Sequence, residues 1–382
     1  MTDIEKQRQL IDETDEQLLE LLTKRMECSK QIALIKKEKG LPVYDSRRER
    51  SVISGISSKA DPQLVTYMQS VWEMIFSVSR SYQSRFMTDG SKLRSLIDDA
   101  KKNTAETFPS YAVVACQGIE GANSQLACDR VFRDPGIMYF SRFEGVFQAV
   151  SSGMCRYGIL PIENSTAGSV NEVYDLMRKN KFYIVRSVKY KIEHCLMAKP
   201  GTKLSDITEI RSHEQAISQC SEYLMTLSDD IAVTAVENTA VAARQVSESN
   251  ETGTAAICSR ECAELYGLNV LKDNIGNSDS NFTRFIVISK KLEIYPGSDK
   301  ISLMMQLPHR PGSLAQVISK FSALGLNLTK LESRPIAGKD FEFMFYFDVR
   351  ADVAGEDVET LLCEFDEQID GFTYLGSYTE IS

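Results

Sequence analysis

Apolar residues at the start of the chain recur at the spacing of one helical face. Residues 3–39 contain neither Gly nor Pro, and Ile4, Ile11, Leu18 and Ile32 fall on a near-heptad stripe. The pattern predicts one long amphipathic helix. Because a single helix of this length cannot bury its stripe within one chain, we expect a partner subunit.

Further helices are predicted after Gly40, which ends the first one together with Pro42. Asp45 can cap a short second helix that runs to residue 53. Asp61 followed by Pro62 predicts the start of a third helix that continues to about residue 85. The first 90 residues are therefore expected to form an all-α domain.

Polar residues interrupt the apolar faces of these helices. Arg25 stands in the stripe between Leu18 and Ile32, and Lys36 lies roughly 20° around the same face. Ser79 and Gln83 continue the apolar face of the third helix at an i, i+4 spacing. Two cations in a helical core require an anion, which is either a ligand or a Glu or Asp of the chain itself.

Strands and helices alternate between residues 111 and 289, and a different order follows. Two α/β lobes are predicted, with strands at residues 111–116, 137–140, 157–162, 183–197, 209–212, 231–236, 254–258 and 282–289. Residues 87–109 are expected to be a linker with a short helix. From residue 300 the order βαββαβ predicts an α+β, ferredoxin-like fold.

A polar stretch follows one of these strands, within Gly158–Val170. Pro161 marks the expected end of the strand, and Glu163, Asn164, Ser165 and Thr166 lead into a helix. Polar groups between the carboxyl end of a strand and the start of a helix are typical of ligand sites in α/β sheets and suit an anion. An ordinary turn with a Ser or Asn cap is the alternative.

Composition narrows the class of protein. The net charge of −9, from 44 basic and 53 acidic residues, argues against nucleic acid and a membrane surface as partners. The nine cysteines are scattered without a CxxC pair, which favours reduced thiols, and three histidines make a metal site improbable. The charged N-terminus and the lack of a long apolar run predict a cytoplasmic protein. We expect neither metal nor cofactor.

Three motifs resemble those of prephenate dehydratases. They are the Pro161–Val170 stretch, the Ser212–Ala216 segment followed by Gln219 and Cys220, and the Asn281–Phe285 segment. The resemblance implies a two-lobed cleft of the periplasmic-binding-protein type. It implies that Thr283 orients the ring hydroxyl that prephenate loses in the reaction. Glu163 is a candidate for the acid that gives this hydroxyl a proton. The other implied contacts with prephenate are Asn164, Ser165, Thr166, Gln215, Thr283, Arg284 and Phe285. Arg284 could instead pair with an acid inside the domain.

The helical region resembles the helical chorismate mutases. The spacing R-x₁₆-R-x₁₀-K-x₁₁-R-E, followed by S-x₃-Q, implies a substrate site made by Arg8, Arg25, Lys36, Asp45, Arg48, Glu49, Ser79 and Gln83. Lys36, Glu49 and Gln83 are the implied catalytic residues. Arg8 and Arg25 are about 25 Å apart along a helix. If both serve one site, Arg8 must come from a second subunit.

The C-terminal region resembles the ACT domain linked to dehydratases. Its two motifs, Arg310–Leu314 and Leu331–Pro335, imply a regulatory phenylalanine site formed by Pro311, Gly312, Ser313, Leu314, Glu332, Ser333, Arg334 and Pro335. Ser313 stands where Ala is typical.

Together these resemblances imply a homodimeric or larger bifunctional enzyme that converts chorismate through prephenate to phenylpyruvate and is inhibited by phenylalanine. The expected domains are a mutase at 1–90, a linker at 91–109, a dehydratase at 110–290 and an ACT domain at 299–382. Two alternatives stay open: a helical domain that is only a dimerisation arm, and a small-molecule sensor. The cations of the first helix argue against a sensor.

Overall fold

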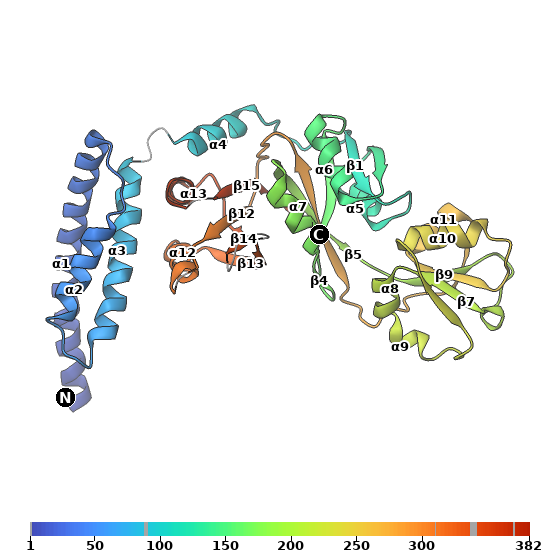
Figure 1. Cartoon of the computed structure of the whole chain (residues 1–382), viewed down its shortest axis with the longest axis horizontal. Helices are drawn as coiled ribbons and strands as arrows, with labels where there is room; N and C mark the ends of the chain where they lie inside the picture. Colours follow the sequence, from blue (N-terminus) through green and yellow to red (C-terminus); the bar gives the residue numbers. More distant parts are fainter. Residues whose placement is uncertain (1, 88–90, 310, 337–341, 370) are drawn as a thin grey trace. The chain divides into compact units, whose positions relative to one another are not determined.

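The computed structural model describes residues 2–87, 91–309, 311–336, 342–369 and 371–382. Its contacts divide the chain into two compact units, which are described separately. The first unit combines Met1–Asp98 with Met304–Thr373, and the second combines Asp99–Leu303 with Tyr374–Ser382. The final residues of the chain therefore belong to the second unit (Figure 1).

Three helices open the first unit: α1 (Asp3–Lys39), α2 (Ser46–Ser57) and α3 (Val65–Met87). A capping box between Thr2 and Glu5 starts α1, and Gly40 ends it in the left-handed conformation at φ 62°. The three predicted helices are confirmed, with two corrections. The second continues to Ser57 rather than ending at residue 53. The third begins at Val65 rather than at Pro62, because Asp61 accepts a hydrogen bond from the Gln63 amide at 2.8 Å and forms a separate turn.

The apolar stripe of α1 is mostly uncovered within the chain. Ser29 and Ala33 are the buried residues of the helix. By contrast, Ile4 is 66% exposed and Leu21 is 65% exposed. The described part of the chain therefore leaves this face available for a partner.

A seven-stranded sheet forms the first lobe of the second unit. Its order is β16-β5-β11-β3-β1-β2, with β4 paired to β3. The strands are β1 (Val113–Gln117), β2 (Gly136–Phe140), β3 (Tyr157–Asn164), β4 (Gly168–Ser169), β5 (Tyr183–Lys191), β11 (Phe282–Ser289) and β16 (Glu380–Ile381). Its helices are α5 (Asn123–Val131), α6 (Phe143–Ser152) and α7 (Asn171–Lys179), and α4 (Lys92–Asn103) precedes the lobe.

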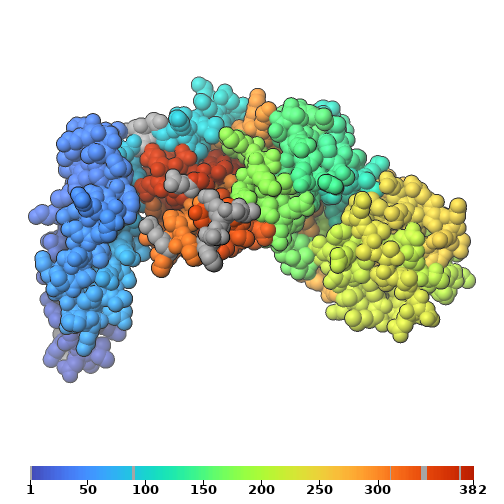
Figure 2. All heavy atoms as spheres, viewed as in Figure 1, coloured from blue at the N-terminus to red at the C-terminus, as the bar shows by residue number. Residues whose placement is uncertain are grey.

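A five-stranded sheet of order β10-β6-β9-β7-β8 forms the second lobe. Its strands are β6 (Cys195–Ala198), β7 (Glu209–Ser212), β8 (Ala232–Ala235), β9 (Thr254–Cys258) and β10 (Asn269–Lys272). Its helices are η1 (Leu204–Asp206), α8 (Glu214–Gln219), α9 (Ser221–Leu224), α10 (Thr239–Glu248) and α11 (Arg260–Tyr266). Figure 2 shows this lobe, coloured yellow, as a mass distinct from the green first lobe.

Two predicted strand limits are wrong, and both errors fall where the lobes meet. The strand expected at 183–197 is two strands, because β5 belongs to the seven-stranded sheet and β6 to the five-stranded one. Pro161 does not end β3, which continues to Asn164. The pairing register between β3 and β11 shifts beside Arg284 and Phe285. A bulge of this kind accommodates proline, which cannot donate to the ladder.

The βαββαβ order predicted after residue 300 is confirmed in its elements. They are β12 (Lys300–Leu307), α12 (Ser313–Ala323), β13 (Asn327–Pro335), β14 (Phe343–Arg350), α13 (Glu356–Gln368) and β15 (Thr373–Tyr378). The sheet order is β13-β14-β12-β15. The rings of Phe347 and Phe365 pack against Phe321 at 5.8 and 5.5 Å between centroids. Across the described residues, no helix is long and apolar enough to cross a bilayer.

Candidate functional sites

The predicted helical cluster is centred on Arg25 of α1. Its guanidinium donates a hydrogen bond to the Ser79 hydroxyl of α3 and lies 5.8 Å from the centre of the Phe76 ring. Burial lowers the pKa of Arg25, and the charge of Glu49 partly offsets this. A cation whose burial is incompletely compensated is suited to an anionic ligand.

Lys36 and Glu49 lie in the same electrostatic neighbourhood. Lys36 donates to the backbone oxygen of Val43, and burial lowers its pKa against the opposing charges of Asp45 and Glu49. Glu49 forms an ion pair with Arg80 of α3. Arg80 is a residue that sequence reasoning missed, although it directly follows the predicted Ser79.

Of the other predicted mutase residues, some lie in the helical cluster and one lies away from it. Asp45 caps α2 by accepting a hydrogen bond from the backbone amide of Arg48 at 2.9 Å. Gln83 is buried, and its Oε1 is unpaired among the described residues. Arg8 is exposed on α1, seventeen positions before Arg25. The fold of one chain therefore gathers Arg25, Lys36, Asp45, Glu49 and Ser79 but not Arg8.

Asn164 is the centre of the predicted dehydratase site. Its Nδ2 donates to the Thr283 hydroxyl at 3.0 Å and to Asn281 Oδ1 at 2.8 Å. Its Oδ1 accepts from the backbone amide and hydroxyl of Thr166 at 3.0 and 2.7 Å. Asn164 and Thr283 are also paired in register between β3 and β11. The structure thus brings together four residues that lie 119 positions apart at most.

Gln219 extends this network into the second lobe. Its Nε2 donates to Thr166 at 2.7 Å, and its Oε1 accepts from Asn281 at 3.0 Å and contacts His194 Nε2 at 2.9 Å. Burial lowers the pKa of His194 against the effect of the Gln219 hydrogen bond. Gln219 and Asn281 stood in motifs of the sequence without a role assigned to either, whereas no pattern indicated His194.

A polar cavity of about 250 Å³ opens on this network. Thr166 and Gln215, two of the predicted contacts, line it with His194, Gln219 and Asn281. Ser165 does not line it: its hydroxyl donates to the Ser280 carbonyl at 2.7 Å. Side chains from both lobes converge here, as expected for a ligand cleft.

Arg284 and Phe285 make extensive contacts inside the chain. The guanidinium of Arg284 is 6% exposed and is committed to Glu163 at 3.0 Å, Glu380 at 2.9 Å and the Tyr378 hydroxyl at 2.8 Å. This geometry supports the alternative of pairing inside the domain. Phe285 is buried in the hydrophobic core with Phe132.

Glu163 faces a second cavity of about 540 Å³, which Asn164, Ser165, Lys189, Phe282 and Arg284 also line. Arg284 therefore faces this cavity in addition to its internal partners. The ion pair with Arg284 stabilises a carboxylate charge on Glu163. This arrangement supports an anchoring role for Glu163 over the role of proton donor.

The predicted regulatory residues are only partly gathered within one chain. A cavity of about 380 Å³ is lined by Pro311, Ser313 and Leu314 with Phe343 and Phe345. Ser333 is paired with Phe345 across the strands, while Glu332 is paired with Tyr346 and points toward Lys330 at 3.8 Å. Arg334 and Pro335 follow on β13, opposite Met344 and Phe343. Arg310 of the first motif lies outside the described residues.

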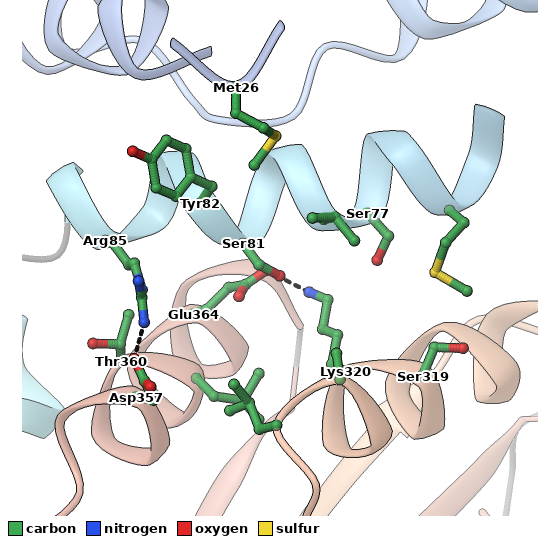
Figure 3. A pocket seen from close by; sticks show the side chains of 15 residues that line it. Met26, Ser77, Ser81, Tyr82, Arg85, Ser319, Lys320, Asp357, Thr360 and Glu364 are labelled. Carbon is green, nitrogen blue, oxygen red and sulfur yellow. Dashed lines mark hydrogen bonds and ion pairs between the residues drawn. The ribbon is translucent and has the colours of Figure 1, made fainter. Parts of the chain in front are cut away.

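A further cavity lies within the first unit, among α3, α12 and α13, and none of the predicted site residues lines it (Figure 3). Glu364 crosses it, accepting from Ser81 at 3.2 Å and pairing with Lys320. Arg85 pairs with Asp357 at its edge. Among the described residues, no group of His, Cys, Asp and Glu could hold a metal ion.

Comparison with known proteins identifies two regions of the chain. Residues 7–84 match the family model of chorismate mutase type II, and residues 114–293 match that of prephenate dehydratase. The chain is 34% identical over 277 residues to arogenate dehydratase/prephenate dehydratase 2 of Arabidopsis thaliana, covering 69% of this chain and 72% of that protein. It is 29% identical over 384 residues to the bifunctional chorismate mutase/prephenate dehydratase of Escherichia coli, covering 97% and 95%.

Among solved structures, the prephenate dehydratase of Arthrobacter aurescens in complex with L-Phe is 28% identical, with a TM-score of 0.64 over 70% of this chain and 89% of that one. The chain spans 66% of the length of arogenate dehydratase 3 of Arabidopsis thaliana and 95% of the length of the Escherichia coli enzyme. The two clusters and the two family models define an enzyme that joins an isomerase domain to a lyase domain. The chain belongs to the prephenate dehydratase family, with a chorismate mutase domain at its N-terminal end.

Proposed function

We propose that this chain converts chorismate to prephenate in its helical domain and then prephenate to phenylpyruvate in its two-lobed domain. The observation that carries the proposal is that each family match coincides with a polar cluster of suitable chemistry. The helical match contains Arg25, Lys36 and Ser79, and the dehydratase match contains Asn164 and Thr283. The boundaries 1–90, 91–109, 110–290 and 299–382 remain our proposed division of the chain.

The proposed mutase chemistry is a pericyclic rearrangement, which moves no proton and forms no covalent intermediate. The enzyme can accelerate it by holding the compact substrate conformer and by stabilising charge on the ether oxygen as its bond breaks. Arg8, Arg25 and Arg48 would bind the two carboxylates. Lys36 and the side-chain nitrogen of Gln83 would donate to the ether oxygen. For Gln83 this requires that its amide nitrogen, rather than its buried amide oxygen, faces the ligand. Glu49 would accept from the ring hydroxyl.

We propose that the mutase site is completed by a second copy of the chain. The exposed apolar stripe of α1 requires cover, and Arg8 is too far along the same helix to reach a ligand at Arg25. An isologous dimer of α1 helices meets both needs, because the start of one helix can then approach the Arg25 region of the other.

In the proposed dehydratase reaction, prephenate loses its ring hydroxyl as water and its ring carboxylate as CO₂, and the ring becomes aromatic. The hydroxyl must gain a proton as its bond to carbon breaks. Thr283, held by Asn164 at 3.0 Å, would orient this group. The amide and hydroxyl groups of Thr166, Gln215 and Gln219 would bind the remainder of the substrate in the cleft.

We propose further that the βαββαβ region is an ACT domain of ferredoxin-like fold that binds phenylalanine and inhibits the dehydratase. The cavity lined by Pro311, Ser313 and Leu314, with two phenylalanine rings, suits an aromatic amino acid. The Arthrobacter aurescens relative, described in complex with L-Phe, supports this ligand. Glu332 and Ser333 would meet the ammonium group at an interface with a second copy.

The deciding experiment supplies chorismate to the purified chain and follows prephenate and phenylpyruvate separately. Both products should form, and added prephenate should give phenylpyruvate without the mutase step. Phenylpyruvate from prephenate without any mutase activity would support a helical domain that serves only as a dimerisation arm. Ligand binding without either turnover would support a sensor. Because relatives include arogenate dehydratases, arogenate is supplied in parallel, and faster turnover of arogenate would contradict prephenate as the substrate.

A further inference from the structure

The last residues of the chain form part of the dehydratase sheet. Strand β16 pairs in parallel with β5, placing Glu380 beside Ser187 and Ile381 beside Val188. The approach is close: a Cβ added to Gly376 would lie 2.3 Å from the Ile184 carbonyl oxygen, and Gly376 has a φ of 138°. Only glycine meets both conditions, so the sequence is specifically suited to this docking.

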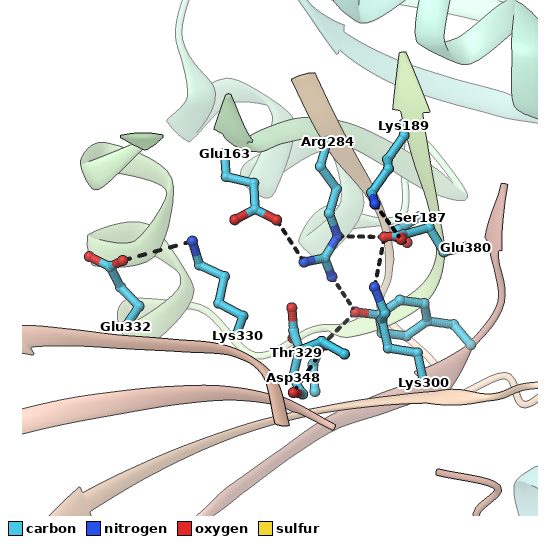
Figure 4. Close-up of polar contacts among 12 residues, drawn as sticks. Glu163, Ser187, Lys189, Arg284, Lys300, Thr329, Lys330, Glu332, Asp348 and Glu380 are labelled. Atoms are coloured by element: carbon cyan, nitrogen blue, oxygen red, sulfur yellow. Dashed lines mark hydrogen bonds and ion pairs between the residues drawn. The ribbon is translucent and has the colours of Figure 1, made fainter. Parts of the chain in front are cut away.

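The docked segment delivers a carboxylate into a buried cluster of charges (Figure 4). Glu380 Oε2 lies 2.8 Å from Lys300 Nζ, 3.1 Å from the Ser187 hydroxyl and 2.9 Å from Arg284 Nε. Its other oxygen lies 3.5 Å from Lys189. Burial acts to raise the pKa of Glu380, but the Lys300 hydrogen bond and the charges of Arg284, Lys300 and Lys189 outweigh it and lower the pKa.

Arg284 connects this cluster to the candidate site. Its Nη1 pairs with Glu163 at 3.0 Å, its Nη2 donates to Tyr378 at 2.8 Å, and its Nε is paired by charge with Glu380. Glu163 and Arg284 directly adjoin Asn164 and Thr283 in the two paired strands. The register between β3 and β11 shifts at Arg284, which interrupts the backbone hydrogen bonds of the two strands. The side-chain contacts of Arg284 supplement those bonds at this point.

We propose that Glu380 is a positioning residue for the dehydratase reaction: by holding the guanidinium of Arg284, it fixes the strands that carry Asn164 and Thr283. The proposal rests on the dehydratase function proposed above. In this role Glu380 acts through Arg284 and not by contact with the substrate. Its removal leaves a buried arginine without one of its anions, and the guanidinium and Glu163 then rearrange beside the reacting groups. Small displacements of this kind act on the rate of the chemical step.

The test compares Glu380→Gln, Glu380→Asp and Tyr378→Phe in the full chain, with Glu264→Gln on the exposed face of α11 as the matched control. Glu380→Gln should lower kcat on prephenate about 10- to 100-fold while KM changes less than about threefold. Glu380→Asp should restore part of the rate, because it retains the charge. Tyr378→Phe, which removes one partner of Arg284, should give a smaller fall in kcat.

Chorismate mutase activity in the same preparations reports general damage to the protein. The proposal is overturned if folded Glu380→Gln keeps the wild-type kcat, or if both activities fall equally. If Glu380→Gln does not fold, Tyr378→Phe decides, and an unchanged kcat overturns the proposal. A wild-type chain that never turns over prephenate contradicts the proposed function instead, so the two failures are distinguishable.

Discussion

The helical cluster and the two-lobed cleft place different chemistry on different scaffolds. The helical cluster presents cations, and burial lowers the pKa of both Arg25 and Lys36. The cleft presents amides and hydroxyls: Asn164, Thr283 and Gln219 hydrogen-bond one another directly or through neighbours. Charged groups suit the mutase rearrangement, in which the carboxylates of the substrate must be held in the reactive conformation. Neutral, pre-oriented groups suit a reaction that needs one leaving group held in line.

The two regions also differ in how complete one chain makes them. In the cleft, both lobes come from the same chain and the hydrogen bonds of Asn164 are satisfied internally. In the helical cluster, Arg8 lies far from Arg25, and the stripe of α1 is exposed. We infer that the mutase depends on assembly, whereas the dehydratase cleft is formed within the subunit. The predictions below test this contrast.

The largest effect is expected from Arg25→Ala. Removing the half-buried guanidinium should lower mutase kcat by about 10²–10³-fold or more, because in the proposed site its charge holds the substrate in the reactive conformation. Dehydratase activity on added prephenate should be retained. Steady-state assays of both steps check this, with Lys24→Ala, an exposed neighbour on α1, as the control. Equal loss of both activities in a folded variant would contradict separate sites.

Thr283→Ala should produce the reverse pattern. Dehydratase kcat should fall by about 10²-fold while prephenate binding changes little, since a group aimed at the leaving hydroxyl acts mainly in the transition state. Mutase activity should be unchanged. Thr226→Ala, which removes an exposed threonine hydroxyl of the second lobe, is the control. Normal turnover by Thr283→Ala would transfer the role to another residue of the cleft.

Mixing Arg8→Ala with Arg25→Ala chains tests whether the mutase site is shared. In a mixed dimer, one of the two sites would carry both arginines and the other neither. After full subunit exchange, half the chains form mixed dimers, so about a quarter of wild-type mutase activity should return. As the control, fluorescence or mass spectrometry must show that the subunits have exchanged. No recovery despite proven exchange would rule out the intersubunit position of Arg8.

Gly312→Val tests regulation. Gly312 has a φ of 84° before α12, and a Cβ there meets no atom of the described residues within 4 Å, so the change costs backbone strain of about 1–2 kcal/mol without a clash among those residues. The added side chain should block phenylalanine and desensitise the dehydratase while activity persists. Gly325→Val is a matched control, with a φ of 65° and equally open space. Calorimetry showing no phenylalanine binding to the wild type would end the regulatory proposal.

The sequence predicted most of the fold because its periodicities are local. The helix over Asp3–Lys39 and the βαββαβ order follow from patterns that neighbouring residues determine. Strand limits at Pro161 and residue 191 were missed because they depend on which sheet accepts the strand. Strand β16 was missed entirely, since two residues carry no periodic signal and its partner β5 lies almost 200 positions earlier.

The motifs had a similar limit for the site residues. Motifs indicated Asn164 and Thr283, and the structure pairs them. They gave no sign that Arg284 also has partners inside the domain. The reason is that Glu380, one of those partners, is 96 positions away and belongs to no motif. Arg80 and His194 were missed for the same reason: their importance arises from tertiary contacts with Glu49 and Gln219.

The smallest expected effect concerns His194, which links the two lobes. Its folded pKa lies below the ordinary value of 6.5 because burial disfavours the imidazolium, despite the Gln219 hydrogen bond. As pH falls through about 6.5, the unfolded chain takes up this proton and the folded chain does not. The folded state therefore loses stability as pH falls below 6.5 and gains nothing from His194 above it.

Replacing His194 with Gln removes this titration. Calorimetry of the unfolding transition of the second unit at pH 8 and at pH 5.5 should show that acid destabilises the wild type more than His194→Gln, by about 1 kcal/mol. Carboxyl groups contribute equally to both proteins, so only the difference between them is informative. His309→Gln, an exposed histidine of the first unit, should follow the wild type. Parallel acid responses in all three proteins would mean that His194 accepts its proton as readily in the folded cleft as in the unfolded chain, and the cleft would then carry a cation at that pH.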